Sequence, residues 1–259
     1  MRIKGIIFDF GFTLFYFEDV SLEKYLECYK IGLQKSLEQL KKVNILSNEK
    51  NSKKFFRLFI NTRNDFFKES RSSKNEYTTS FIFQRVLEMM VENGFINDLT
   101  PMSEEFYVEL ASTYHSFEEL EWKPFPHTRE TLEKISQMDD IKMAVLSNHP
   151  HHYMVKNLLK KYDLYHYFDK VITSAKFGRR KPAPEIFFHA LQKLGLENDA
   201  GECLMCGDEH ADIVGGHSAG LKTILCERAY KFPFEKEIHI SEFIRVNNIS
   251  EILNHIDLK

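Results

Sequence analysis

Short apolar runs bounded by turn residues recur along the chain and predict buried strands. Six of them have the length of a strand covered on both faces: 5–10, 141–148, 170–174, 202–208, 222–226 and 243–246. Between them, apolar residues three or four positions apart predict helices at 127–138, 151–162, 184–195 and 210–220. Gly195 and Gly220 are suitable helix ends. Strands that alternate with helices predict an α/β fold with a parallel sheet.

The segment from about residue 18 to residue 120 breaks this alternation. It contains four helical patterns and no convincing strand: the first begins after Ser21, and the others cover 53–67, 80–94 and 103–114. The polar run 47–54 predicts a loop between two of these helices. We expect the aromatic residues of this segment to fill a helical bundle of its own: Phe55, Phe56, Phe59, Phe66, Phe67, Phe81 and Phe83. A helical block inserted after the first strand predicts a second domain.

After the insert, Pro124 and Pro126 mark the return to the first domain. The final segment, 243–259, predicts a last strand followed by a closing helix. The chain of 259 residues, 43% of them hydrophobic, is long enough for one large domain or two moderate ones.

The chain has no excess of positive charge, and this balance bears on its partners. Lys and Arg number 35 against 38 Asp and Glu, so we expect no nucleic-acid partner. No apolar run approaches the roughly 18 to 20 residues of a membrane span, and we expect no membrane association. The 4 cysteines are too few for a disulfide scaffold, which predicts a cytoplasmic protein with reduced thiols. Cys203 and Cys206 are expected to be buried strand residues.

Candidate chemistry lies at the ends of the predicted strands, where open parallel sheets bind ligands. Reading along the chain, these positions hold Asp9 with Gly11 and Thr13, Ser147 with Asn148, Lys181, and Asp208 with Asp212. Two carboxylates suit a hard divalent cation such as Mg²⁺, a lysine would neutralise nearby negative charge, and hydroxyls would donate to phosphate oxygens. An aspartate at such a strand end is also able to attack phosphorus and form an aspartyl phosphate.

In the order and spacing of these residues, the chain resembles the haloacid dehalogenase superfamily. The stretches that carry the resemblance are DFGFTL, LSN, RRKPAPEIF and GDEHADIVGGHSAGL. The resemblance implies a three-layer Rossmann-like core of residues 1–17 and 121–259 with an all-helical cap domain at 18–120. It also implies a hydrolase that binds Mg²⁺ and a small phosphorylated substrate. The sequence leaves the oligomeric state open between a monomer and a homodimer.

Carried over position by position, the resemblance implies a role for each strand-end residue. Asp9 would be the nucleophile, Ser147 a phosphate donor and Lys181 the stabilising cation. From their own places at the strand ends, we expect Thr13 and Asn148 to lie at the substrate as well. Asp9, Gly11 through its carbonyl group, Asp208 and Asp212 would hold the metal, although Asp212 also suits a role in supporting Lys181.

The family's second aspartate falls on Gly11, which keeps the carbonyl group and lacks the carboxylate. The metal site is therefore expected to survive, whereas the usual general acid and base is lost, at a typical cost of about 10² to 10⁴ in rate. Phe12 also replaces the glycine that usually follows. Substitutes for the missing acid could come from Glu18, Asp19, His149 or His210.

Three hypotheses accommodate this loss. The first is a slow Mg²⁺-dependent phosphatase of a small metabolite that works through an aspartyl phosphate. The second is a 2-haloacid dehalogenase, whose chemistry needs no proton donor, although the family's dehalogenases dispense with the metal ligand retained here as Asp208. The third is an impaired phosphate-binding or regulatory protein.

Overall fold

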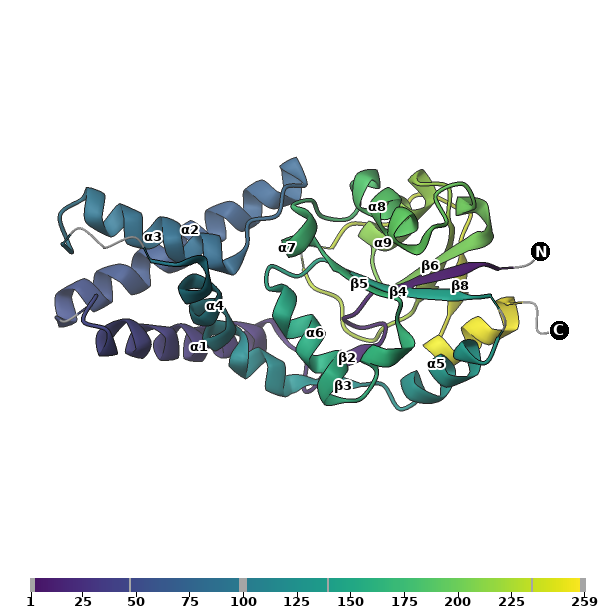
Figure 1. Ribbon diagram of the computed structural model, residues 1–259, viewed down its shortest axis with the longest axis horizontal. Coiled ribbons are helices and arrows are strands. Elements are labelled where there is room, and N and C mark those ends of the chain that lie inside the picture. Colours follow the sequence, from purple (N-terminus) through teal and green to yellow (C-terminus); the bar gives the residue numbers. More distant parts are fainter. Residues whose placement is uncertain (1–2, 47, 98–101, 139, 234, 257–259) are drawn as a thin grey trace. The chain divides into compact units, whose positions relative to one another are not determined.

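Parallel strands form one sheet in the computed structural model, which describes residues 3–46, 48–97, 102–138, 140–233 and 235–256. Within these residues the sheet has six strands in the order β5-β4-β1-β6-β7-β8, and every neighbouring pair is parallel (Figure 1). The strands are β1 (Gly5–Phe8), β4 (Lys142–Ser147), β5 (Lys170–Thr173), β6 (Cys203–Gly207), β7 (Lys222–Cys226) and β8 (Ile244–Val246). All six strands predicted from the sequence are confirmed.

Helices cover both faces of this sheet and complete three layers (Figure 1). Helices α8 (Pro184–Leu194) and α9 (His210–Ser218) cover one face, where Phe187 packs in a buried cluster with Ile7 and Met205. On the other face lie α5 (Thr128–Ser136), α6 (His152–Lys161) and the 3-10 helix η3 (Ile249–His255). Alternate residues of each strand point to opposite faces, so a strand covered on both sides is apolar throughout. The predicted α/β class is confirmed.

Contacts between residues divide the chain into two units. The core unit consists of Met1–Val20 and Trp122–Lys259 and contains the sheet, and the helical unit is Ser21–Glu121. Other short elements of the core unit include α7 (Ser174–Phe177), η1 (Tyr165–Tyr167) and η2 (Ala200–Glu202).

The core unit also contains a two-stranded antiparallel ladder that the sequence patterns did not predict. Strand β2 (Phe15–Phe17) pairs with β3 (Trp122–Pro124), which places Phe17 opposite Trp122. Each strand has only three residues, too few for an alternating pattern to be recognised, and the two are brought together by tertiary contact.

The helical unit contains α1 (Leu22–Lys42), α2 (Glu49–Ser73), α3 (Thr79–Glu92) and α4 (Glu104–Glu121). Side chains that accept a backbone N–H cap the first three helices at Ser21, Asn48 and Thr78. The prediction of a loop at 47–54 is therefore wrong for most of that run, because the Asn48 cap starts α2 at Glu49; residue 47 lies outside the described residues.

Aromatic packing fills the centre of the helical unit, as predicted, although not with every residue named. Phe55, Phe59 and Phe83 are fully buried, and the rings of Phe59 and Phe83 lie 4.5 Å apart. Phe67 and Phe81 are exposed instead, so their assignment to the core is wrong. Phe67 lies on the outer side of α2, where its ring contacts Arg71.

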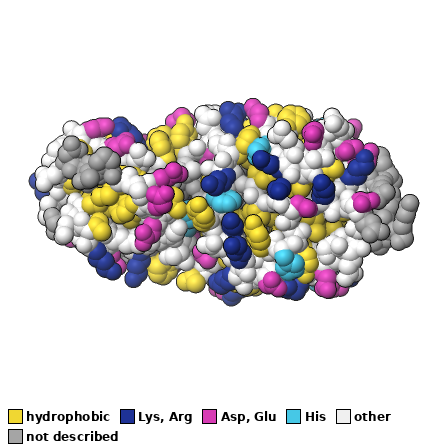
Figure 2. Space-filling model, in the orientation of Figure 1, with side chains coloured by type: hydrophobic (Ala, Val, Ile, Leu, Met, Phe, Trp, Pro, Cys, Tyr) yellow, Lys and Arg dark blue, Asp and Glu magenta, His cyan; other side chains and the backbone are white. Residues whose placement is uncertain are grey.

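The end of the chain differs in detail from the prediction. The last strand is β8, and the closing helix is the 3-10 helix η3; residues 257–259 lie outside the described part. Cys203 and Cys206 are buried on β6 as expected. None of the helices in the described ranges combines the length and apolar character that a bilayer crossing requires. Figure 2 shows basic and acidic side chains interspersed over the face in view.

Candidate active site

Asp9 lies at the carboxyl edge of the sheet because it directly follows β1, one of the two central strands. Its backbone N–H donates to the carbonyl oxygen of Cys206 at 2.8 Å, which continues the ladder between β1 and β6 by one residue. The residue is buried. The position that the sequence predicts for a nucleophile is thus fixed by the register of two adjacent strands.

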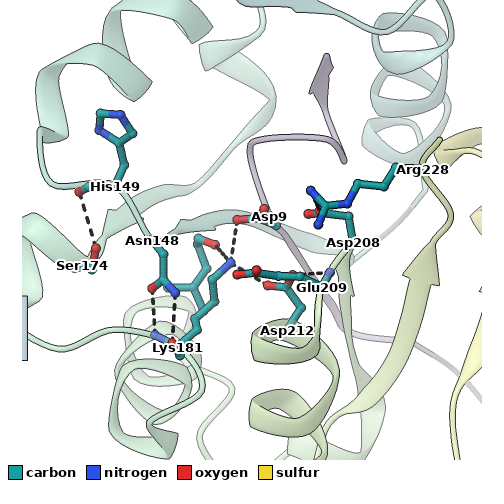
Figure 3. Close-up of polar contacts among 10 residues, drawn as sticks. Asp9, Asn148, His149, Ser174, Lys181, Asp208, Glu209, Asp212 and Arg228 are labelled. Carbon is teal, nitrogen blue, oxygen red and sulfur yellow. Dashed lines mark hydrogen bonds and ion pairs between the residues drawn. The ribbon is translucent and has the colours of Figure 1, made fainter. Parts of the chain in front are cut away.

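The ammonium group of Lys181 joins this carboxylate to a second one. Its Nζ donates to Asp9 Oδ1 at 2.5 Å, to Asp212 Oδ1 at 2.6 Å and to the carbonyl oxygen of Leu146 at 2.8 Å (Figure 3). The side chain is 0% exposed. Burial opposes the positive charge, but Asp212 and Asp9 outweigh it, and the pKa of Lys181 is raised above its ordinary value. Lys181 therefore remains a cation in the site.

Asn148 holds the backbone of Lys181 in place. The amide Nδ2 donates to the Lys181 carbonyl oxygen at 3.0 Å, and the Lys181 N–H donates to Oδ1 at 2.8 Å. The side chain predicted to touch substrate is thus engaged in positioning the lysine. Ser147 is buried at the end of β4, next to the carbonyl that Lys181 contacts. Thr13 is buried too, and its hydroxyl has no hydrogen-bond partner within the described residues.

A capping box at the start of α9 positions Asp212. The Glu209 N–H donates to Asp212 Oδ2 at 3.2 Å, while the Glu209 side chain accepts the backbone N–H of Asp212. Gly207 makes room for this arrangement, because a Cβ there would overlap the Asp212 carboxyl group. Burial, opposed by Lys181, raises the pKa of Asp212 to about 7. Asp212 therefore belongs to both the helix cap and the lysine cluster.

Three carboxylates converge and form an oxygen-rich group. One oxygen each from Asp9, Asp208 and Asp212 lies within 4.8 Å of the other two. An all-oxygen donor set of this kind fits a hard divalent cation such as Mg²⁺. Burial raises the pKa of Asp208 well above its usual range, and the neighbouring Arg228 opposes that rise. The residues present therefore suit the metal that the resemblance implies.

The space beside Gly11 is occupied by Trp122. A Cβ on Gly11 would lie 2.9 Å from Cη2 of the indole, closer than real Cβ atoms come to a heavy atom. Phe12 adopts φ 58, in the left-handed region that favours glycine, and its ring centroid lies 5.3 Å from that of Trp122. The two residues that depart from the usual motif, Gly11 and Phe12, thus both lie against the indole of Trp122.

The side chains considered as substitutes for the missing acid have other contacts. Glu18 pairs with Lys123 at 2.5 Å, across the β2–β3 ladder, and Asp19 is exposed at φ 48. The Nδ1 of His149 lies 2.9 Å from the carbonyl oxygen of His151, and Figure 3 shows its ring pointing away from the carboxylates. His210 is half-buried at the start of α9. Their roles as proton donors stay predictions.

Arg228 is a site residue that was not predicted from the sequence, and its Nη1 lies 2.9 Å from Asp208 Oδ2. A signal for it existed. Arg228 follows strand β7 by two residues, so the strand-end argument that found Asp9 and Asp208 applies to it as well. Trp122 had no comparable signal, because its contact with Gly11 depends on tertiary packing.

Comparison with known proteins identifies a matching family, two similar proteins and a similar solved structure. A family model described as haloacid dehalogenase-like hydrolase matches residues 51–226. The chain is 31% identical over 145 residues to a phosphoglycolate phosphatase of Aquifex aeolicus, covering 56% of this chain and 63% of that protein. It is 25% identical over 208 residues to a ribulose-1,5-bisphosphate 5-phosphatase of Halopiger xanaduensis, covering 80% of this chain and 81% of that protein.

A solved structure has a similar fold. The 2-haloacid dehalogenase from Pseudomonas syringae superposes with a TM-score of 0.61 at 19% identity, covering 98% of this chain and 97% of that one. At this identity the likeness concerns the fold alone.

Proposed function

This chain belongs to the haloacid dehalogenase-like hydrolase family, and on that premise we propose that it is a Mg²⁺-dependent phosphatase of a small phosphorylated metabolite. The observation that carries the proposal is the position of Lys181 Nζ, within hydrogen-bond distance of both Asp9 and Asp212. An aspartate held by a buried cation at the edge of a parallel sheet suits attack on a phosphoryl group. The two similar phosphatases support the same class of substrate, a small phosphorylated acid or sugar.

In the proposed reaction, a carboxylate oxygen of Asp9 attacks the phosphorus atom. The bond from phosphorus to the ester oxygen breaks, and that oxygen leaves with the electron pair and takes up a proton from solvent. Water then attacks the phosphorus of the aspartyl phosphate and gives up a proton to solvent, which releases inorganic phosphate and restores Asp9. Lys181 remains charged beside Asp9 throughout and balances the negative charge of the substrate.

A bound Mg²⁺ would be held by Asp9, Asp208 and Asp212 with the carbonyl group of Gly11, and would neutralise charge on the transferring phosphoryl group. Ser147 and Thr13 are proposed donors to phosphate oxygens, since the Thr13 hydroxyl has no hydrogen-bond partner in the described part of the chain. The helical unit is proposed as the cap that excludes water from the reaction.

The missing acid at Gly11 restricts the leaving group. Without a positioned proton donor, an alkoxide is a poor leaving group, and the rate loss is about 10² to 10⁴. Substrates whose leaving group is already a weak base, such as aryl and acyl phosphates, avoid most of this loss. We therefore propose a steep dependence of kcat/KM on the pKa of the leaving group.

The test is a series of aryl and alkyl phosphates assayed with Mg²⁺. We expect phosphate release that rises as the leaving-group pKa falls, that stops on addition of EDTA, and that is lost in Asp9→Asn. Asp199→Asn, a surface acid paired with Lys4, is the matched control and should retain activity. Release of chloride from a 2-haloacid without Mg²⁺, and no phosphate release, would overturn the proposal in favour of a dehalogenase.

A further inference from the structure

Arg228 forms a buried ion pair with the carboxylate that the proposed function assigns to the metal. Its Nη1 lies 2.9 Å from Asp208 Oδ2, with side chains only 8% and 3% exposed. Its other terminal nitrogen, Nη2, lies 2.6 Å from Glu235 Oε1. One guanidinium group thus connects Asp208 to a second acid outside the carboxylate cluster.

Aromatic rings hold this guanidinium group. Its Cζ lies 4.9 Å from the ring centroid of Phe12 and 5.8 Å from that of Phe232, and the two ring centroids are 6.0 Å apart. Phe12 is one of the two residues, with Gly11, that depart from the usual motif in the loop after β1. The large Phe12 side chain is therefore one of the groups that pack against the Arg228 guanidinium group.

The pairing changes the charge balance of the site. Lys181 contacts Asp9 and Asp212, and Arg228 contacts Asp208, which it reaches from the side away from Lys181 (Figure 3). All three converging carboxylates consequently have a cation of the protein beside them. A divalent cation added to this group would meet a buried positive charge a few ångströms away, where screening is weak.

Glu235 offers Arg228 a partner when it leaves Asp208. The Glu235 carboxylate also accepts the backbone N–H of Phe232, so it is fixed to the segment that carries Arg228. A guanidinium group that loses Asp208 while keeping Glu235 is not left buried without a counter-charge.

From these contacts we propose that Arg228 is a resident counter-ion of Asp208 that a divalent cation must displace. The segment after β7 would thus set the affinity of the metal site. This inference rests on the proposed function, which assigns the metal site. It goes beyond that function by assigning Arg228 as a group that competes with the divalent cation for Asp208. Loss of a charged contact of this kind corresponds to a change of about 10-fold to 100-fold in an equilibrium constant.

The test is a titration of the purified full chain with Mn²⁺, following free Mn²⁺ by electron paramagnetic resonance, and with Mg²⁺ by calorimetry. We expect Arg228→Met to bind Mn²⁺ at least about tenfold more tightly than the unaltered chain. Glu235→Gln should bind it more weakly, because it removes the second acid paired with Arg228 and leaves Asp208 as its ion-pair partner. Opposite effects of two substitutions in one segment would not arise from a general loss of structure.

Two controls make the result specific. Arg245→Met removes an exposed arginine, 58% exposed and paired with Glu227, and should leave cation affinity unchanged. In an Asp208→Asn background, Arg228→Met should no longer tighten binding. If Arg228→Met proves unstable without metal, its melting temperature should rise more on addition of Mg²⁺ than that of the unaltered chain, by the linkage between binding and stability.

Unchanged or weaker cation binding by a folded Arg228→Met chain would overturn this proposal and leave the phosphatase proposal intact, since that proposal is tested by Asp9-dependent phosphate release. No binding to either chain at millimolar Mn²⁺ would overturn both the competitor role and the metal requirement.

Discussion

The indole Cη2 of Trp122 lies 2.9 Å from the point that a Cβ on Gly11 would occupy. The indole is 4% exposed, and its ring centroid lies 5.2 Å from that of Phe17 and 5.7 Å from that of Phe10. It has little freedom to move aside. The glycine at the position of the usual acid is therefore matched by a buried side chain in the space next to it.

This contact predicts that restoring the acid alone will fail. Gly11→Asp should destabilise the protein by about 1–3 kcal/mol, the usual cost of overpacking a core, and should not raise turnover of an alkyl phosphate. The double variant Gly11→Asp/Trp122→Leu should be more active than Gly11→Asp, because the carboxylate then has room. Trp122→Leu alone is the control. A gain in turnover at full stability from Gly11→Asp by itself would contradict the prediction.

The second prediction concerns Gly207, whose backbone lies close to the Asp212 carboxyl group. Gly207→Ala would place a Cβ against the Asp212 carboxyl group, so it should displace Asp212 from Lys181. We expect a loss of stability of about 1–3 kcal/mol and a fall in kcat/KM with the best aryl phosphate. Gly201→Ala is a matched control, since a Cβ at Gly201 would meet no atom within 4 Å. Equal effects of the two substitutions would argue against this role of Gly207.

Asn148 is predicted to act through Lys181. Asn148→Ala removes two hydrogen bonds to the Lys181 backbone and should cost about 1–3 kcal/mol. Because the ammonium group then loses its fixed position, kcat should fall more than KM rises. The comparison is Asn247→Ala, which removes an exposed amide paired with Glu251 and should change neither quantity. A rise in KM alone would indicate instead that Asn148 binds substrate.

The lowered pKa of His152 predicts that the free energy of unfolding depends on pH. Burial, with smaller effects of Lys176 and Lys156, lowers the pKa of His152 to about 4 from 6.5, and its Nδ1 lies 3.0 Å from Thr173 Oγ1. Between pH 6.5 and 4 the unfolded chain therefore binds a proton that the folded chain does not, so stability falls as the pH falls. Because the ring is partly exposed, solvent screening limits the loss to about 1 kcal/mol at pH 5.

The measurement is chemical unfolding at pH 7 and at pH 5. His152→Gln should lose about 1 kcal/mol less between these two pH values than the unaltered chain. His166→Gln, which alters an exposed histidine near Asp163, serves as the comparison and should follow the unaltered chain. If both variants lose the same stability on acidification, His152 is not the group responsible.

Local patterns were enough to predict the sheet, its helices and the helical unit. Buried parallel strands have continuous apolar runs, and helices repeat every three or four residues, so both are visible without any knowledge of tertiary contacts. Asp9 and Asp208 could be grouped for the same reason, because each directly follows a parallel strand and parallel strands end at one edge. Lys181 reaches the same edge from the segment between α7 and α8. The polar composition of 47–54 wrongly predicted a loop for most of that run, because the boundary of α2 is set by the Asn48 cap, which starts the helix at Glu49.

What the sequence by itself determined is therefore the order of the elements and the set of acids and the lysine at one edge of the sheet. Tertiary structure decided what lies against them: Trp122 beside Gly11, Arg228 on Asp208, and Asn148 on the backbone of Lys181. The physical reason is that periodicity follows from the geometry of one strand or helix. A contact between side chains far apart in the chain depends on register and on packing in three dimensions.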